Sequence, residues 1–218
     1  MPAATLTIIS HNYGSWSLRG WLLCELAGFE VDVLTAAVDD EAARAELLLL
    51  SPSYLVPRLE DGDTTAWGAW AIAEHLHEIN PPHPIFPAEL THRAHCRSVC
   101  GEVMSGFANL RTALPMNLRA RHTGFNVWSG AQTDIDRITT IWRDCLGRYG
   151  GPYLFGSTPS AADAIYAPIC TRFETYDVAL DADCARYRDT MLVHPSMIKW
   201  IAQAHAEPGQ IEELDAEF

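Results

Sequence analysis

Apolar residues in the first 80 positions follow strand spacing and helix spacing in turn, which predicts a small α/β domain. The apolar run LTIIS and the alternating run VDVLT predict strands, and the segment between them has leucines and tryptophans at helical spacing before Gly28. The predicted elements are a strand at 6–10, a helix at 17–28, a strand at 31–35, a helix at 39–50, a hairpin of strands at 56–60 and 64–68, and a helix at 69–79. Their order is β-α-β-α-β-β-α.

The pattern changes after a proline-rich segment, NPPHPIFP at residues 80–87. Proline lacks a backbone donor and interrupts helices and sheets, so this segment predicts a linker. Beyond it every strong pattern is helical, with helices expected at 89–113, at 132–149 before Gly150–Gly151, at 159–176 with a capping box of Ser160 and Asp163, and at about 195–206. The sequence thus predicts an α/β domain at residues 1–79 and an all-helical domain at residues 88–218.

The composition is that of a globular protein, because 48% of the 218 residues are hydrophobic and 20% are charged. The formal net charge of −13 disfavours nucleic acid and an anionic membrane surface as partners, since both require a basic face. No apolar run reaches the length of about 18 residues needed for a membrane span. The first residues lack the pattern of a signal peptide, and six scattered cysteines favour reduced thiols. We therefore expect a cytoplasmic protein.

Five segments form a more specific pattern. They are NYGSWSLRGWLL at 12–23, SPSYLVPRLEDG at 51–62, AIAEHL at 71–76, SGFANLRTALPMNLR at 105–119 and YLFGSTPSAADAIYAP at 153–168. In this order and spacing they resemble the glutathione S-transferase superfamily, and the first resembles its serine-type bacterial members. The resemblance implies a thioredoxin-like domain that holds glutathione, a helical domain that forms the pocket for a second, electrophilic substrate, and a homodimer. It also implies a hydroxyl donor near the first helix that lowers the pKa of the attacking thiol.

Val56 and Pro57 match the strand that binds the cysteinyl part of glutathione in this superfamily. The resemblance implies a cis peptide bond between them, with the backbone N–H and C=O of Val56 paired to the ligand. The alternative is a trans proline at the edge of a sheet.

Gly68 and Ala69 depart from the superfamily pattern of an acid followed by a serine. In relatives the acid holds the ammonium of the γ-glutamyl group, while the serine and the helix N–H groups hold its carboxylate. Here both side chains are missing, and the N–H of Ala69 remains as a donor at the start of a helix. Two interpretations stay open: an altered thiol specificity, or glutathione held by other contacts.

Gly14 and Ser15 are the second departure, because the superfamily pattern has serine at both positions and the first often activates the thiol. We rank Ser15 first as the catalytic hydroxyl and Tyr13 second, since the spacing from Tyr13 to Arg19 resembles that of tyrosine-type members. Ser17 is interpreted as the N-cap of the first helix and Arg19 as a structural or interdomain residue. Gly14 leaves room for backbone N–H groups to approach a ligand.

Both departures fall on the same half of the predicted site, while the strand that recognises the cysteinyl group is intact. We therefore expect a smaller thiol as co-substrate, such as cysteine or a cysteine persulfide, and no tightly bound cofactor. This repurposing resembles superfamily members of bacterial pathways to sulfur-containing natural products, including the homologue of tropodithietic acid biosynthesis. An ordinary glutathione transferase with a weakened site, and a non-catalytic binding module, are the alternatives.

The predicted pocket for the second substrate lies on the helical side. The resemblance places Met104, Phe107, Arg111 and Met116 at the cleft, although helix core is the alternative for Met104 and Phe107. Arg111 and Arg119 offer guanidinium groups that match carboxylates, so either would accept an acidic substrate. Exposure to solvent is the alternative for both arginines.

The segment THRAHCRSVC places His92, Cys96 and Cys100 one helical turn apart, with His95 beside them. These residue types bind zinc, but the segment has neither a C-x-x-C pair nor a second ligand cluster nearby in the sequence. We favour a helix face with buried cysteines and solvent-facing histidines, and predict no metal site.

Overall fold

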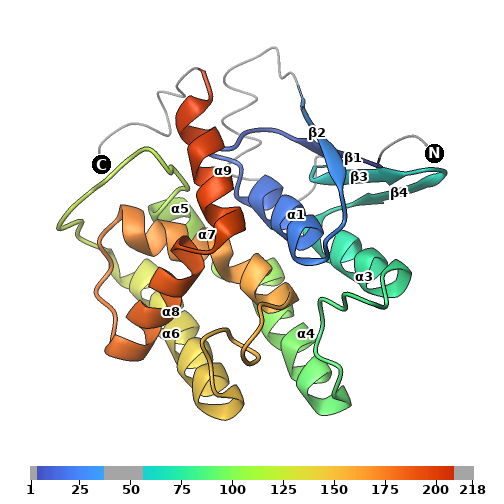
Figure 1. Ribbon diagram of the computed structural model, residues 1–218. Helices are drawn as coiled ribbons and strands as arrows, with labels where there is room; N and C mark the ends of the chain where they lie inside the picture. The colour runs from blue at the N-terminus through green and yellow to red at the C-terminus, as the bar shows by residue number, and fades with distance from the viewer. Residues whose placement is uncertain (1–3, 37–55, 209–218) are drawn as a thin grey trace.

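The computed structural model of the protein describes residues 4–36 and 56–208. Within these residues a mixed sheet with its helices precedes an all-helical part, as the sequence predicted (Figure 1). The helix predicted at 39–50 lies outside the described residues.

The sheet has four described strands in the order β2-β1-β3-β4. They are β1 (Ala4–Ile8), β2 (Val31–Thr35), β3 (Arg58–Asp61) and β4 (Thr64–Trp67). Leu6 of the central strand β1 lies opposite Val33 in the parallel pair with β2 and opposite Leu59 in the antiparallel pair with β3. The β3–β4 turn places Gly62 at a φ of 58°, in the left-handed region that glycine adopts easily.

Two helices of the first part, α1 (Ser15–Leu26) and α3 (Ala69–Ile79), pack against each other. Residues 15 to 24 of α1 are all buried, because this helix contacts α3 on one side and α7 of the helical part on another. Gly28 follows α1 at a φ of 60° and ends it, as predicted. The first turn of α1 therefore lies at the junction of the two parts.

The helical part contains six described helices: α4 (Leu90–Ser105), α5 (Ala108–Ala113), α6 (Ser129–Tyr149), α7 (Ala161–Thr175), α8 (Ala182–Leu192) and α9 (Pro195–Ala206). The buried helix α7 lies at its centre and contacts α1, α4 and α8 (Figure 1). The predicted capping box starts α7, since Asp163 Oδ2 accepts from the Ser160 N–H at 2.7 Å. Gly150 ends α6 at a φ of 82°, again as predicted.

Two predictions about the helical part are wrong. The single helix expected at 89–113 is divided into α4 and α5, because Phe107 has a left-handed φ of 57° and is buried there. A side chain at Gly106 would place its Cβ 2.7 Å from the carbonyl oxygen of Glu102, so this break requires glycine. Helix α8 was not predicted, although Asp181 caps it by accepting from two backbone N–H groups.

Among residues 4–36 and 56–208, no helix has both the length and the apolar character needed to cross a membrane.

Candidate thiol-binding site

The loop between β1 and α1 brings the first candidate residues together, and Gly14 has a fixed place in it. A Cβ at position 14 would lie 2.3 Å from the carbonyl oxygen of Ser10 and 2.9 Å from Ser17 Oγ. Glycine is therefore required by close approach within the chain itself, and a serine at this position does not fit the observed loop.

Ser15 is the first residue of α1 and is 4% exposed. Its N–H donates to the carbonyl oxygen of Tyr13 at 3.0 Å. Ser17 lies inside α1, and its Oγ accepts from the N–H of Ile9 at 3.1 Å. The prediction that Ser17 is the N-cap is wrong, because Gly14 occupies that position and makes no side-chain cap.

Tyr13, the second hydroxyl candidate, is 4% exposed and is held by a residue of the helical part. Its hydroxyl oxygen accepts from Arg119 Nη2 at 3.0 Å, and the Arg119 guanidinium lies 5.6 Å from the ring centroid. Arg119 also donates to the carbonyl oxygen of Glu207 at 3.1 Å. The guanidinium predicted to accept an acidic substrate is thus engaged within the chain.

Two residues that the sequence did not single out, Asn12 and Glu207, anchor the same loop. Glu207 Oε2 accepts from Ser10 Oγ and from the Asn12 N–H, both at 2.8 Å. The side chain of Asn12 donates to Asn117 Oδ1 at 3.0 Å and accepts from the Leu118 N–H at 2.8 Å. Asn12 stands in the quoted loop motif and was open to prediction, whereas nothing in the sequence pairs Glu207 with position 10 or 12.

The predicted cysteinyl-binding residues lie where β3, α1 and the start of α3 meet. The Val56–Pro57 bond is cis, as predicted. The carbonyl oxygen of Pro57 accepts from the Gly68 N–H at 2.9 Å, which ties the start of β3 to the start of α3. A Cβ at Gly20 would lie 2.4 Å from Pro57 Cβ, so glycine allows α1 to contact the proline ring directly.

The start of α3 offers no side-chain donor or acceptor at its first two positions. Gly68 is the N-cap, with a φ of 80° and a ψ of 140°, and makes no side-chain cap. Ala69 follows and is fully buried. A Cβ at Gly68 would meet no atom of the described chain within 4 Å, so the place of the missing acid is open space and not refilled.

Two family models match the chain. The glutathione S-transferase N-terminal domain matches residues 13–79, and the glutathione S-transferase C-terminal domain matches residues 126–202. The two matches together cover well over half of the chain. It belongs to the glutathione S-transferase superfamily.

Solved structures similar to this glutathione S-transferase-family chain have the same fold over nearly its full length. A glutathione transferase homologue from Burkholderia GL BGR1 with bound glutathione is 20% identical, with a TM-score of 0.67, 94% of this chain and 98% of that chain covered. Maleylacetoacetate isomerase from Anaeromyxobacter dehalogenans 2CP-1 is 21% identical, with a TM-score of 0.65 and 90% of each chain covered. Glutathione S-transferase unclassified 2 from Bombyx mori is 15% identical, with a TM-score of 0.68 and 94% of each chain covered. These likenesses support the fold alone. No curated protein matches the chain significantly.

The residues predicted for the second substrate of this superfamily member differ in exposure. Phe107 and Met116 are buried, whereas Met104 and Arg111 are partly exposed. The Arg111 guanidinium lies 5.3 Å from the ring centroid of Trp16, the residue that follows Ser15. The fold therefore brings Arg111 of the helical part close to the start of α1.

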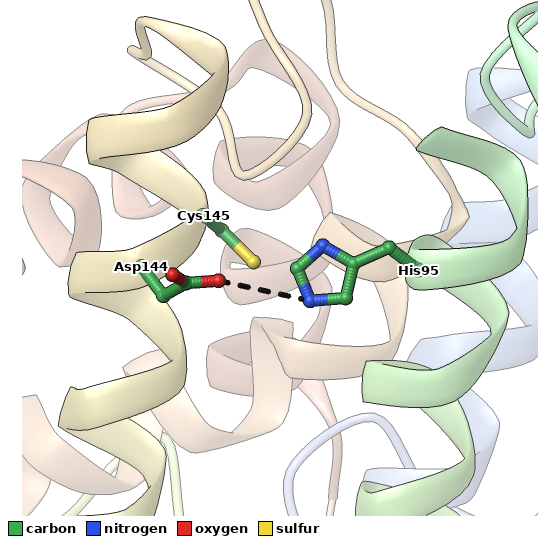
Figure 2. Close-up of side chains that lie close together, drawn as sticks. All are labelled: His95, Asp144 and Cys145. Carbon is green, nitrogen blue, oxygen red and sulfur yellow. Dashed lines mark ion pairs between the residues drawn. The ribbon is translucent and has the colours of Figure 1, made fainter. Parts of the chain in front are cut away.

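The predicted helix face around His95 has a partner that the sequence did not show. Figure 2 shows His95 of α4 facing Asp144 and Cys145 of α6; its Nε2 lies 3.8 Å from Asp144 Oδ2. The other ring nitrogen, Nδ1, lies 2.8 Å from the Tyr149 hydroxyl. The ligand atoms of the three residues lie within 4.8 Å of one another, a set that suits a metal ion in residue type. Burial raises the pKa of Cys145 to about 12, which favours the protonated thiol and an ordinary His–Asp contact.

Proposed function

We propose that the chain is a transferase in which a small thiol, bound at Val56–Pro57, attacks an electrophilic small molecule. Family membership supports the reaction class, because these enzymes position a sulfur nucleophile against a second substrate. In a substitution the sulfur electron pair forms the new C–S bond, the leaving group departs with its bonding pair, and the thiol proton passes to solvent. Cysteine and cysteine persulfide are the thiols that fit best, in place of glutathione.

The observation that carries this proposal is the open, uncharged start of α3. Glutathione would find neither an acid for its ammonium nor a serine for its carboxylate at Gly68 and Ala69. A hydrogen bond to a charged group contributes about 1.5–3 kcal/mol and a neutral one about 1 kcal/mol. Losing one of each weakens glutathione binding by roughly two to three decades, at about 1.4 kcal/mol per decade. A thiol without a γ-glutamyl group loses nothing there.

The thiol needs a donor that stabilises its thiolate, since the thiolate is the nucleophile. We assign this role first to Ser15, at the start of α1, and second to Tyr13. Position 14, where serine-type relatives often place the activating residue, excludes a side chain by its 2.3 Å approach to Ser10. Gly14 contributes by letting the loop close on itself, which places Ser15 at the first turn of the helix.

Two rivals make different predictions. An ordinary glutathione transferase would bind glutathione through contacts other than those at Gly68 and Ala69, and the Burkholderia homologue with bound glutathione keeps this rival in view. A non-catalytic binding module would show no thiol-dependent turnover. A cytoplasmic homodimer is the assembly and location that we propose from family membership.

Turnover with a panel of thiols separates these functions. The full chain is assayed with 1-chloro-2,4-dinitrobenzene and, in turn, glutathione, cysteine, cysteine persulfide and γ-glutamylcysteine, each corrected for its uncatalysed rate. The proposal predicts higher kcat/KM with cysteine or its persulfide than with either γ-glutamyl thiol. A preference for glutathione identifies the ordinary transferase, and no turnover and no binding with any thiol identifies the module.

A further inference from the structure

Three arginines meet at the junction of the two parts of the chain: Arg19 of α1, Arg111 of α5 and Arg172 of α7. Arg19 is 1% exposed and Arg172 is 4% exposed, whereas Arg111 is partly exposed. Such depth is unusual for guanidinium groups, which are seldom fully buried unless they are paired. We call this group the arginine cluster.

The observed partners of the arginine cluster are neutral backbone carbonyl groups. Arg19 donates from Nε to Ile165 at 2.7 Å and from Nη1 to Ser15 at 3.3 Å. Arg172 donates from Nε to the carbonyl oxygen of Leu114 at 2.8 Å, and Arg111 donates to that of Val103. Within residues 4–36 and 56–208, these bonds solvate the cations but bring no opposite charge.

One buried donor of the cluster has no partner at all. Arg19 Nη2 is shielded from solvent and has no hydrogen-bond acceptor in the structure, while the other two nitrogens of the same guanidinium are bonded. A buried charged donor without an acceptor is costly, on the order of several kcal/mol, unless a ligand or ion supplies one. The structure therefore has room in its hydrogen bonding for an anion at this guanidinium.

The charges of the three arginines oppose one another. Burial lowers the pKa of Arg19 well below its ordinary value, and the nearby charges of Arg111 and Arg172 lower it further. Burial likewise lowers the pKa of Arg172 to about 9, with Arg111 adding to the effect. Asp134 acts in the opposite direction on Arg111, but its carboxylate already accepts from the Leu110 N–H at 2.9 Å.

The cluster also borders the proposed thiol site. The guanidinium carbons of Arg19 and Arg111 lie 4.6 and 5.3 Å from the ring centroid of the same indole, Trp16. Trp16 follows Ser15, whose carbonyl oxygen accepts from Arg19. A molecule that reacts at Ser15 therefore has two cations and an aromatic ring beside it, with the partly exposed Arg111 on the side open to solvent.

We propose that the arginine cluster binds the carboxylate of the second substrate, which makes that substrate an aromatic or otherwise planar electrophile bearing an acidic group. Arg111 receives the carboxylate, Arg19 Nη2 supplies the unpaired donor behind it, and Trp16 packs against the apolar body. Guanidinium groups suit this task because their planar donors match the two oxygens of a carboxylate. The proposal rests on the proposed function only for the word substrate, because binding of the anion requires no reaction.

A binding experiment without a thiol tests the cluster directly. Isothermal titration calorimetry compares 3-nitrobenzoate with 3-nitrobenzamide, which has the same ring and no charge, on the full chain at pH 7. We expect the carboxylate to bind roughly tenfold tighter or better, although the net charge of −13 repels anions in general. Equal affinity for the two probes overturns the proposal.

Substitutions locate the effect. Arg111→Gln should bring the two affinities to within about twofold, and Arg111→Lys should keep part of the preference because the charge remains without the planar fork. Arg121→Gln is the matched control: Arg121 is exposed, pairs with Glu174 at 3.8 Å and should leave the preference unchanged. Thermal melting confirms that each variant is folded. A preference that survives in Arg111→Gln, or disappears in Arg121→Gln, overturns the assignment.

Turnover keeps this test separate from that of the proposed function. With a thiol that is active in the panel, 4-chloro-3-nitrobenzoate should give a lower KM than 4-chloro-3-nitrobenzamide. Turnover of both without a difference in KM leaves the transferase standing and overturns the carboxylate site. A carboxylate preference in binding, with no turnover of either compound, leaves the site standing and contradicts the transferase.

Discussion

At the scale of single residues, the two glycines that replace polar residues of the superfamily pattern have opposite explanations. Gly14 is required by its own surroundings, because a Cβ there would lie 2.3 Å from a backbone oxygen. Gly68 is surrounded by open space, so only its φ of 80° disfavours a side chain. The sequence shows both as the same loss, and only the packing distinguishes a structural glycine from an emptied ligand position.

The steric account of Gly14 predicts that the superfamily serine does not fit here. Gly14→Ser should lower the free energy of unfolding by about 1–3 kcal/mol, because the loop must move to relieve overlap with the Ser10 carbonyl. Urea denaturation measures this. Gly147→Ser is the control, since a Cβ at this helical position meets nothing within 4 Å. A Gly14→Ser variant as stable as the control would show that the loop accommodates a side chain.

At the scale of elements, helices were predictable where their signals are local. Helix α3 has the predicted bounds, and α7 has the predicted capping box. Helix α8 carries Cys184, Tyr187 and Met191 at helical spacing on an otherwise polar segment, a weaker signal that was missed. The break at Phe107 depends on tertiary burial, and so does the meeting of Arg19 with α7; neither leaves a mark in the local sequence pattern.

The segment that follows α9 should stabilise the loop that precedes α1. Glu207→Ala removes the acceptor of two hydrogen bonds, from Ser10 Oγ and the Asn12 N–H, and should lower the free energy of unfolding by about 1–3 kcal/mol. Chemical denaturation followed by tryptophan fluorescence measures the change.

Glu78→Ala, at an exposed position of α3, is the control for this variant and should change stability by no more than about 0.5 kcal/mol. If both variants unfold at the same urea concentration, the contacts of Glu207 contribute nothing measurable and the loop is held by its other bonds.

At the scale of the whole molecule, the fold and its two-part order followed from the sequence, whereas the arrangement of the site did not. Five ordered motifs were sufficient for the superfamily, because each marks a local turn or helix start. The arginine cluster, the contact of Tyr13 with Arg119, and the His95–Asp144 contact of Figure 2 join residues distant in sequence. Spacing along a single chain carries no record of such pairs, so these features required the structure.

Stability should fall on mild acidification, because burial lowers the pKa of His11, His77 and His194 in the folded chain. The unfolded chain then binds more protons below its histidine pKa of about 6.5, so stability rises with pH through this window and is lost as pH falls. Each histidine contributes at most about 1.4 kcal/mol per pH unit.

His11 isolates one part of this effect, since its ring packs 4.5 Å from that of Trp200. The free energy of unfolding of His11→Phe relative to the parent should increase between pH 7.5 and pH 5.5, whereas that of the exposed His83→Gln should stay constant. Urea denaturation at the two pH values measures both. A constant difference for His11→Phe would mean that this ring does not contribute to the pH dependence.

Glutathione affinity in a rebuilt pocket tests the central claim most directly. The claim is that the chain keeps the contacts for a cysteinyl group and lacks those for the γ-glutamyl group. Calorimetric titration of Gly68→Glu/Ala69→Ser should show glutathione binding at least about tenfold tighter than in the parent, with cysteine affinity unchanged within about twofold. Micromolar binding of glutathione by the parent chain, with no gain in the double variant, would contradict it.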